Sequence, residues 1–148
     1  MQLIGIVGLP GSGKSTLFED PSFDRFLKID DIGKNWPLNE QSIHDAIQQN
    51  RSVLVSDIEF CNSHARTEFE KRIGRQFVWI CFENAPWKCA INSLHRVYTG
   101  AKRPLGEELV KIIRLSKSYE PFGNKIQSVK MSDDALNHLP EILLDLMN

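Results

Sequence analysis

The residues best suited to chemistry form a glycine-rich stretch near the start of the chain. Its sequence is Gly8-Leu9-Pro10-Gly11-Ser12-Gly13-Lys14-Ser15, which matches G-x-x-x-x-G-K-S/T at every fixed position. Glycines let the backbone curl so that successive N–H groups point inward and form a concave anion site. Lys14 adds a positive charge for the β- and γ-phosphates, and the Ser15 hydroxyl is placed to bind Mg²⁺. The motif therefore predicts a nucleotide phosphate site, with Thr16 as a further candidate phosphate contact.

Two other uses of glycine fit this sequence less well. A dinucleotide-binding turn needs G-x-G-x-x-G/A, whereas Gly11 and Gly13 are followed by Lys14, Ser15 and Thr16. A GTPase would explain the D-x-x-G pattern of residues 30–33. That pattern begins only sixteen residues after Lys14, which leaves no room for the usual switch segment and its strand. Both classes are therefore disfavoured.

Carboxylates follow two of the strands that we expect. Asp30 and Asp31 end an apolar run, and Asp57 ends the run of residues 52–57. In a parallel α/β sheet, ligands bind outside the carboxyl ends of the strands. A carboxylate at this edge can hold Mg²⁺ or accept the proton of an attacking hydroxyl. The alternative role is structural, because Asp is also common in turns and helix caps.

The elements that must position these residues alternate between strands and helices. Near-continuous apolar runs predict buried parallel strands at residues 3–7, 26–29, 53–55 and 77–82, with a weaker fifth at 126–131. A helix is expected from Lys14 to Asp20, stopped by Pro21, and helical spacing recurs in the later connections. One such face comprises Trp87, Ile91, Leu94 and Tyr98, and another closes the chain at residues 139–146. The pattern predicts a doubly wound α/β sheet in one domain, residues 1–148.

Composition excludes several classes of protein. The 148 residues are 41% hydrophobic and 25% charged, as in a folded domain, and the net charge of −1 gives no overall basic field. Cys61, Cys81 and Cys89 are odd in number and form no C-x-x-C pair, so neither a disulfide framework nor a zinc site is indicated. With no apolar run of membrane-spanning length and no signal sequence, we expect a cytoplasmic protein that does not bind membranes. The oligomeric state stays open.

One segment is unusually basic. Residues 85–104 carry Lys88, Arg96, Lys102 and Arg103 and no acidic residue. Most charge clusters are simply solvated faces of a helix. The functional alternative requires this cluster to lie near a bound anion.

These residues together resemble those of small P-loop kinases, and most closely the kinase domain of phage polynucleotide 5′-hydroxyl kinases. The resemblance covers roughly residues 2–122. It is carried by residues 8–16, 29–31, 53–57, 85–87, 92–96 and 116–120. It implies a three-layer α/β/α fold around a five-stranded parallel sheet in the order 2-3-1-4-5. It also implies a lid over the nucleotide at about residues 96–104.

The resemblance also implies roles for individual side chains. The family's general base falls on Asp30, its lid arginine falls on Arg96, and Asp57 matches an aspartate near the magnesium and the acceptor. One position departs from the family pattern. Where the phage enzymes carry an arginine that holds the substrate's phosphate, this chain has Gly33, followed by Lys34, which lacks the bidentate fork of arginine. Lys34 and Arg103 are candidate substitutes for that arginine.

We therefore expect a kinase that uses ATP and Mg²⁺ to move the γ-phosphate onto a hydroxyl. The acceptor is a nucleic acid, a nucleoside or another small hydroxylated metabolite, and the sequence does not choose among them. Two functions of other classes stay open. One is a regulatory module that binds a nucleotide without transferring phosphate. The other is a protein that binds nucleic acid through Lys88, Arg96, Lys102 and Arg103, with ATP in a structural role only.

Overall fold

The centre of the molecule is a parallel sheet of five strands. The structure is a computed structural model, and it describes residues 1–102, 104–123, 126–131, 134–135 and 137. The strand order is β2-β3-β1-β4-β5, with every neighbouring pair parallel, as the resemblance implies. The strands are β1 (Leu3–Val7), β2 (Leu27–Ile29), β3 (Val53–Ser56), β4 (Val78–Phe82) and β5 (Ile126–Gln127). The fifth strand is shorter than the expected 126–131.

The central strand β1 and its neighbour β3 are the most buried. All four residues of β3 are buried, and so are Ile6 and Val7 of β1. Strands covered on both faces favour such continuous apolar runs over an alternating pattern. Gly5 allows close packing at the centre, since a Cβ there would lie 2.2 Å from Cζ3 of Trp79 in the adjacent β4. The strand that leads to the glycine-rich loop is thus held rigidly from both sides.

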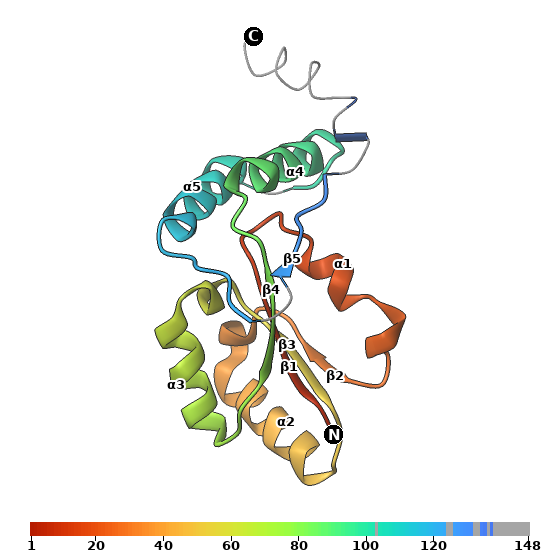
Figure 1. Ribbon diagram of the computed structural model, residues 1–148. Helices are drawn as coiled ribbons and strands as arrows, with labels where there is room; N and C mark the ends of the chain where they lie inside the picture. The colour runs from red at the N-terminus through yellow and green to blue at the C-terminus, as the bar shows by residue number, and fades with distance from the viewer. Residues whose placement is uncertain (103, 124–125, 132–133, 136, 138–148) are drawn as a thin grey trace.

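Helices lie on both sides of this sheet (Figure 1). Helix α1 (Lys14–Phe18) lies on one side, while α2 (Trp36–Gln48) and α3 (Ser63–Ile73) lie on the other. Helices α2 and α3 contact each other through the rings of Trp36 and Phe69, whose centroids are 5.9 Å apart. Helices α4 (Pro86–Tyr98) and α5 (Leu105–Ser116) pack together beyond the ends of the strands. They therefore lie at the edge of the sheet where the chemistry is expected.

Some sequence expectations are adjusted by the structure. Helix α1 ends at Phe18, and Pro21 begins a separate 3-10 turn, Pro21–Phe23. The segment expected as a lid is divided, because residues 96–98 belong to α4 and residues 99–102 and 104 connect α4 to α5. Arg103 and the expected closing helix at 139–146 lie outside the described residues. Within the described ranges, no helix combines the length and apolar composition that crossing a membrane requires.

Candidate active site

The glycine-rich loop connects β1 to α1 as a tight curl. Gly11 and Gly13 have φ angles of 82° and 104°, in the left-handed region that favours glycine. A Cβ added at Gly8 would lie 2.5 Å from Oγ of Ser12, so a side chain there would force the loop open. The N–H of Ser12 donates to the carbonyl of Leu9 at 3.1 Å and closes the turn. The curl expected from the motif is therefore present.

Lys14, the first residue of α1, folds back over the loop. Its ammonium donates to the carbonyl oxygens of Gly8 and Leu9 at 2.7 and 2.9 Å. Burial lowers the pKa of Lys14, and neighbouring acidic groups, Asp30 among them, partly oppose this shift. The positive charge is thus held at the loop, close to where phosphate oxygens would be bound.

A cavity of about 120 Å³ opens beside this loop and is lined by all three predicted catalytic residues, Lys14, Asp30 and Arg96. It is lined by Pro10, Gly11, Gly13, Lys14, Ser15, Asp30, Asp31, Ile58, Arg96 and Glu108. Lys14, Asp30 and Arg96 come from three separate parts of the chain, yet they line the same small space. Thr16 is exposed and does not line this cavity. The cavity of about 120 Å³ is called the phosphate cavity below.

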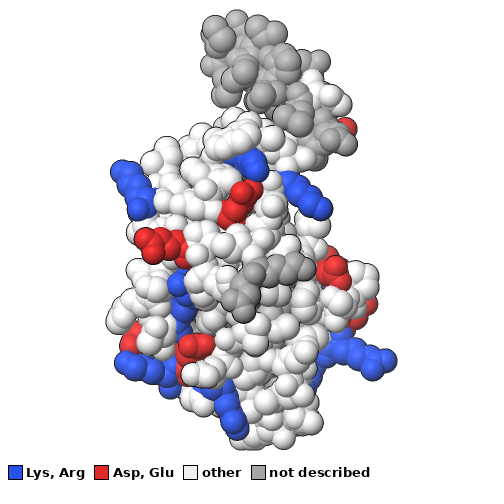
Figure 2. Space-filling model, in the orientation of Figure 1, with Lys and Arg blue, Asp and Glu red and all other residues white. Residues whose placement is uncertain are grey.

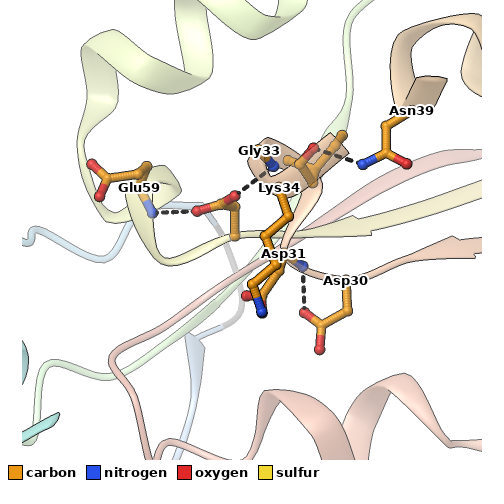
Figure 3. A network of polar contacts seen from close by, with 8 residues as sticks. Asp30, Asp31, Gly33, Lys34, Asn39 and Glu59 are labelled. Atoms are coloured by element: carbon orange, nitrogen blue, oxygen red, sulfur yellow. Dashed lines mark hydrogen bonds and ion pairs between the residues drawn. The ribbon is translucent and has the colours of Figure 1, made fainter. Parts of the chain in front are cut away.

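The two aspartates after β2 have different surroundings (Figure 3). Asp31 has a φ of 48°, an uncommon value for a residue other than glycine, and its N–H donates to Oδ1 of Asp30 at 3.0 Å. The Asp31 carboxylate accepts a bond of 2.8 Å from the Lys34 ammonium. Asp30 holds the turn with Oδ1, and among the described residues its second oxygen, Oδ2, accepts no hydrogen bond. Asp30 is therefore the better placed of the two to accept a proton from a bound hydroxyl.

Asp57 follows β3, as expected, but it does not line the phosphate cavity. Its Oδ2 accepts the N–H of Gly33 at 3.0 Å, and its Oδ1 accepts the N–H of Glu59 at 2.9 Å (Figure 3). It faces a larger cavity of about 550 Å³, whose lining also includes the rings of Trp36, Phe60 and Phe69. The structure thus gives Asp57 a role in fixing the backbone after β2 and after β3.

The structure describes Gly33, which occupies the position of the missing arginine, and Lys34, one of its two proposed substitutes. A Cβ at Gly33 would lie 3.3 Å from Oδ2 of Asp57, so a larger residue would need Asp57 to move. Lys34 is ion-paired with Asp31, and its hydrogen bond to that carboxylate raises the pKa of Lys34. The side chain of Lys34 remains largely exposed. Arg103 is outside the described residues.

Helix α4 contacts the glycine-rich loop through a different face from the one expected. Trp87 and Tyr98, of the expected apolar face, are 57% and 42% exposed, whereas Cys89 and Ser93 are fully buried. A Cβ at Gly11 would lie 2.4 Å from the carbonyl oxygen of Cys89, so the helix lies too close to the loop for any side chain at this position. The expected apolar face is therefore buried only in part, at Ile91 and Leu94, and the close approach of the loop buries Cys89 and Ser93 as well.

Asn92 joins α4 to the loop directly. Its Nδ2 donates to the carbonyl of Gly11 at 2.8 Å and to the carbonyl of Lys130 at 3.0 Å. Asn92 was not singled out as a site residue from the sequence. The available signal was a polar amide close to the predicted lid. Its partner, Gly11, lies 81 positions away along the chain, so local sequence could not identify the contact.

The three described basic residues of the segment 85–104 have different surroundings. Lys88 is ion-paired with Glu83 at 2.8 Å, and Arg96 lines the phosphate cavity. Lys102 is exposed. On the face shown in Figure 2, Lys and Arg side chains are interspersed with Asp and Glu. Of this cluster, Arg96 is the described residue that lies where an anion is expected.

A second cavity, of about 420 Å³, adjoins the phosphate cavity. Both are lined by Pro10, Asp31, Ile58 and Glu108, and the second is also lined by Lys34, Pro104, Glu107 and Lys111. Glu108 is buried in the first turn of α5 and was missed in the sequence. Acidic residues in the first turn of a helix are usually explained by their favourable interaction with the helix dipole. The sequence therefore gave no separate signal that Glu108 lies beside the site.

The residues around the phosphate cavity fit a nucleotide and its metal ion. Gly8 and Gly11 leave no space for a Cβ, and their backbone forms the kind of cradle that binds phosphate oxygens. Ser15 supplies a hydroxyl at the cavity wall, and Asp30 supplies a carboxylate. Among the described residues, no group of three or more His, Cys, Asp or Glu side chains could hold a metal alone. A magnesium ion here would therefore depend on Ser15 and on the phosphates themselves.

Solved structures share this fold along almost the whole chain. A gluconokinase from Sinorhizobium meliloti 1021 has a TM-score of 0.57 at 16% identity, with 99% of this chain and 95% of that chain covered. A candidate kinase from Chloroflexus aurantiacus J-10-fl has a TM-score of 0.54 at 13% identity, covering 97% and 96%. The protein APE1195 has a TM-score of 0.54 at 17% identity, covering 98% and 93%. These identities show the fold alone, which is the α/β fold of P-loop kinases.

No family model matches the sequence, and no curated protein matches it.

Proposed function

We propose that this chain is a single-domain P-loop kinase that transfers the γ-phosphate of ATP to a hydroxyl of a small molecule. The observation that carries the proposal is the phosphate cavity, where Lys14, Asp30 and Arg96 meet beside a glycine-rich cradle. Phosphoryl transfer requires positive charge around the phosphates and an oriented nucleophile, and these side chains supply both. The kinase folds of the structural neighbours agree with this assignment.

Each residue has a distinct task in the proposed reaction. The loop N–H groups and Lys14 bind the phosphates, and Arg96 stabilises the charge on the group in transfer. A magnesium ion held with Ser15 would supply further neutralisation of the phosphate oxygens. The acceptor hydroxyl gives its proton to Asp30 while its oxygen bonds to the γ-phosphorus. The bond from that phosphorus to the bridging oxygen breaks, and ADP leaves.

The acceptor side is the second cavity, of about 420 Å³. It shares four lining residues with the phosphate cavity, so a molecule bound there has direct access to Asp30. The size suits a small ligand, since such pockets usually measure about 300–1,000 Å³. A nucleic-acid hydroxyl, which the resemblance to phage polynucleotide kinases suggests, is the alternative acceptor.

Transfer of labelled γ-phosphate to a panel of sugars, polyols, nucleosides and oligonucleotides tests the proposal. We expect Asp30→Asn to lower kcat by at least ~10²-fold while calorimetry still detects ATP binding. Asp24→Asn is the matched control, because Asp24 precedes β2 and its side chain is 69% exposed in a pair with Lys28. Equal turnover in the Asp30 variant would exclude Asp30 as the base. ATP binding with no transfer to any acceptor would favour a regulatory module.

A further inference from the structure

We infer that Ser93 is a positioning residue, which sets the place of Arg96 in the phosphate cavity through the contact between α4 and the glycine-rich loop. The inference rests on the proposed kinase function and adds to it a residue that does not itself line the phosphate cavity. It depends on which face of α4 meets the loop, on the space between them, and on how the Arg96 side chain is held.

One face of α4 carries both the loop contacts and Arg96. Residues three and four apart are neighbours on a helix surface, so positions 89, 92, 93 and 96 follow one another along one side of α4. Asn92 donates to the carbonyl of Gly11 at 2.8 Å, and Cys89 and Ser93 are fully buried. Arg96, about one turn beyond Asn92, lines the phosphate cavity. The contacts with Gly11 therefore hold the part of α4 that carries Arg96.

Ser93 lies in the narrow space between the helix and the loop. A Cβ added at Gly11 would lie 2.9 Å from Oγ of Ser93. The Ser93 hydroxyl has no hydrogen-bond partner among the described residues, so its small size, more than its polarity, suits this place. In a close-packed contact, added atoms force the neighbouring groups apart. A larger side chain at position 93 would therefore separate α4 from the loop.

The loop has little freedom to retreat from α4. A Cβ at Gly8 would lie 3.1 Å from Cβ of Phe82, the last residue of β4, so the loop also packs against that strand. The Lys14 ammonium ties the loop together through the carbonyls of Gly8 and Leu9. We therefore expect a larger residue at position 93 to displace α4 and to leave the loop in place.

The placement of Arg96 depends on the position of α4. Among the described residues, the Arg96 guanidinium forms no hydrogen bond or ion pair that would hold it independently of the helix. Burial is the main cause of the lowered pKa of Lys14, and the charge of the nearby Arg96 contributes to it. A charge stabilises a transferring group only from the correct position, and a misplacement of about 1 Å can lower the rate by ~10²-fold. A small displacement of α4 would therefore lower kcat.

A double-mutant cycle tests whether Ser93 acts through Arg96. We expect Ser93→Val to lower kcat at least about tenfold in the wild-type background, and less than about twofold when Arg96→Ala is also present. The conservative Ser93→Ala, which adds no atoms, should keep kcat within about twofold of wild type. Equal losses from Ser93→Val in both backgrounds would overturn the inference, because Ser93 would then act independently of Arg96.

Folding of these variants is checked by circular dichroism. Ser93→Thr, which adds a single methyl group, takes the place of Ser93→Val in the cycle if the valine variant does not fold. The expected pattern is the same, with a smaller loss of kcat in the wild-type background.

A crystal structure of the variant gives a result that requires no acceptor. In Ser93→Val we expect the guanidinium of Arg96 to be displaced by about 1 Å or more from its wild-type place, with the backbone of the loop unchanged. An undisplaced Arg96 would overturn the inference. Failure of the wild-type protein to transfer phosphate to any acceptor would instead refute the proposed function, because the displacement is measured without turnover.

Discussion

The carboxylate of Asp57 accepts the backbone N–H of Gly33 at 3.0 Å and thereby joins the ends of the neighbouring strands β3 and β2. The bond fixes the segment that begins with Asp30 and Asp31, which line the phosphate cavity. Asp57 is therefore placed to position the proposed base without reaching the cavity itself.

Replacing Asp57 by alanine removes the acceptor for two backbone N–H groups, those of Gly33 and Glu59. We expect Asp57→Ala to lower the free energy of unfolding by about 1–2 kcal/mol, the usual cost of losing such a cap, and to lower kcat as well. Urea denaturation and steady-state kinetics measure the two effects. Asp20→Ala is the control, because Asp20 caps the 3-10 turn at Pro21–Phe23, which lies outside the site. Similar kinetic losses in both variants would argue against a positioning role.

Removal of the Lys14 ammonium should abolish phosphate binding without unfolding the protein. The group donates to the carbonyls of Gly8 and Leu9, and its burial carries a desolvation cost that lowers its pKa. We expect Lys14→Ala to reduce turnover by at least ~10²-fold, as for other groups that stabilise a transition state. Lys117→Ala, at an exposed position after α5, should leave turnover unchanged. Near-normal activity of Lys14→Ala would reject the nucleotide site.

Arg96 lines the phosphate cavity from α4, which distinguishes it from the exposed Lys102. We expect Arg96→Ala to lower kcat by ~10²-fold or more, because an arginine at the transferring group supplies charge in the transition state. Arg96→Lys should recover only part of this loss, since lysine lacks the planar fork. Single-turnover kinetics would separate the transfer step from product release. Lys102→Ala activity as low as that of Arg96→Ala would indicate a diffuse electrostatic effect.

The amide of Asn92 holds α4 against the glycine-rich loop through Gly11. We expect Asn92→Ala to raise KM for ATP several-fold and to lower stability by ~1 kcal/mol, the typical value of one hydrogen bond. Asn84→Ala is a matched control, because its amide binds the carbonyls of Ser116 and Tyr119 beyond the site. It should lower stability by a similar amount and leave KM for ATP unchanged. Equal KM values for both variants would contradict the role of Asn92.

Cys89, fully buried where α4 meets the loop, should make stability depend on alkaline pH. Burial raises the pKa of Cys89 from 9.0 to about 11, so the thiol ionises in the unfolded chain before it does in the folded one. Its contribution to stability is therefore complete below pH 9 and is lost as the pH rises through about 11. Cys89→Ala should remove roughly 2 kcal/mol of this decline. Urea denaturation from pH 8 to 11 measures this decline. The prediction is contradicted if the free energy of unfolding falls by the same amount in wild type and variant.

Local sequence was sufficient for the features that depend on neighbouring residues. The strand at residues 3–7, the glycine curl and the start of α1 at Lys14 follow one another along the chain, so backbone sterics and the hydrophobic run determine them together. Asp30 and Asp57 were correctly expected directly after strands, because short apolar runs bounded by polar residues are typical of buried strands.

Side-chain partners from distant segments were not determined locally. Asp57 accepts the N–H of Glu59, two residues along the chain, as a local cap, whereas its bond to the N–H of Gly33 exists only because β2 packs beside β3. The buried face of α4 was likewise set by the space that the loop leaves around Gly11.

Taken alone, the order of residues determined a curled glycine-rich loop, the alternation of strands and helices, and the carboxylates that end two strands. The tertiary structure decided which side chains share a cavity: Arg96 and Glu108 line the same cavity as Lys14, whereas Asp57 lines a different one. The reason is that the backbone motif is stabilised by contacts within a few residues. The composition of a cavity depends instead on how whole helices pack, and short-range patterns carry no information on that packing.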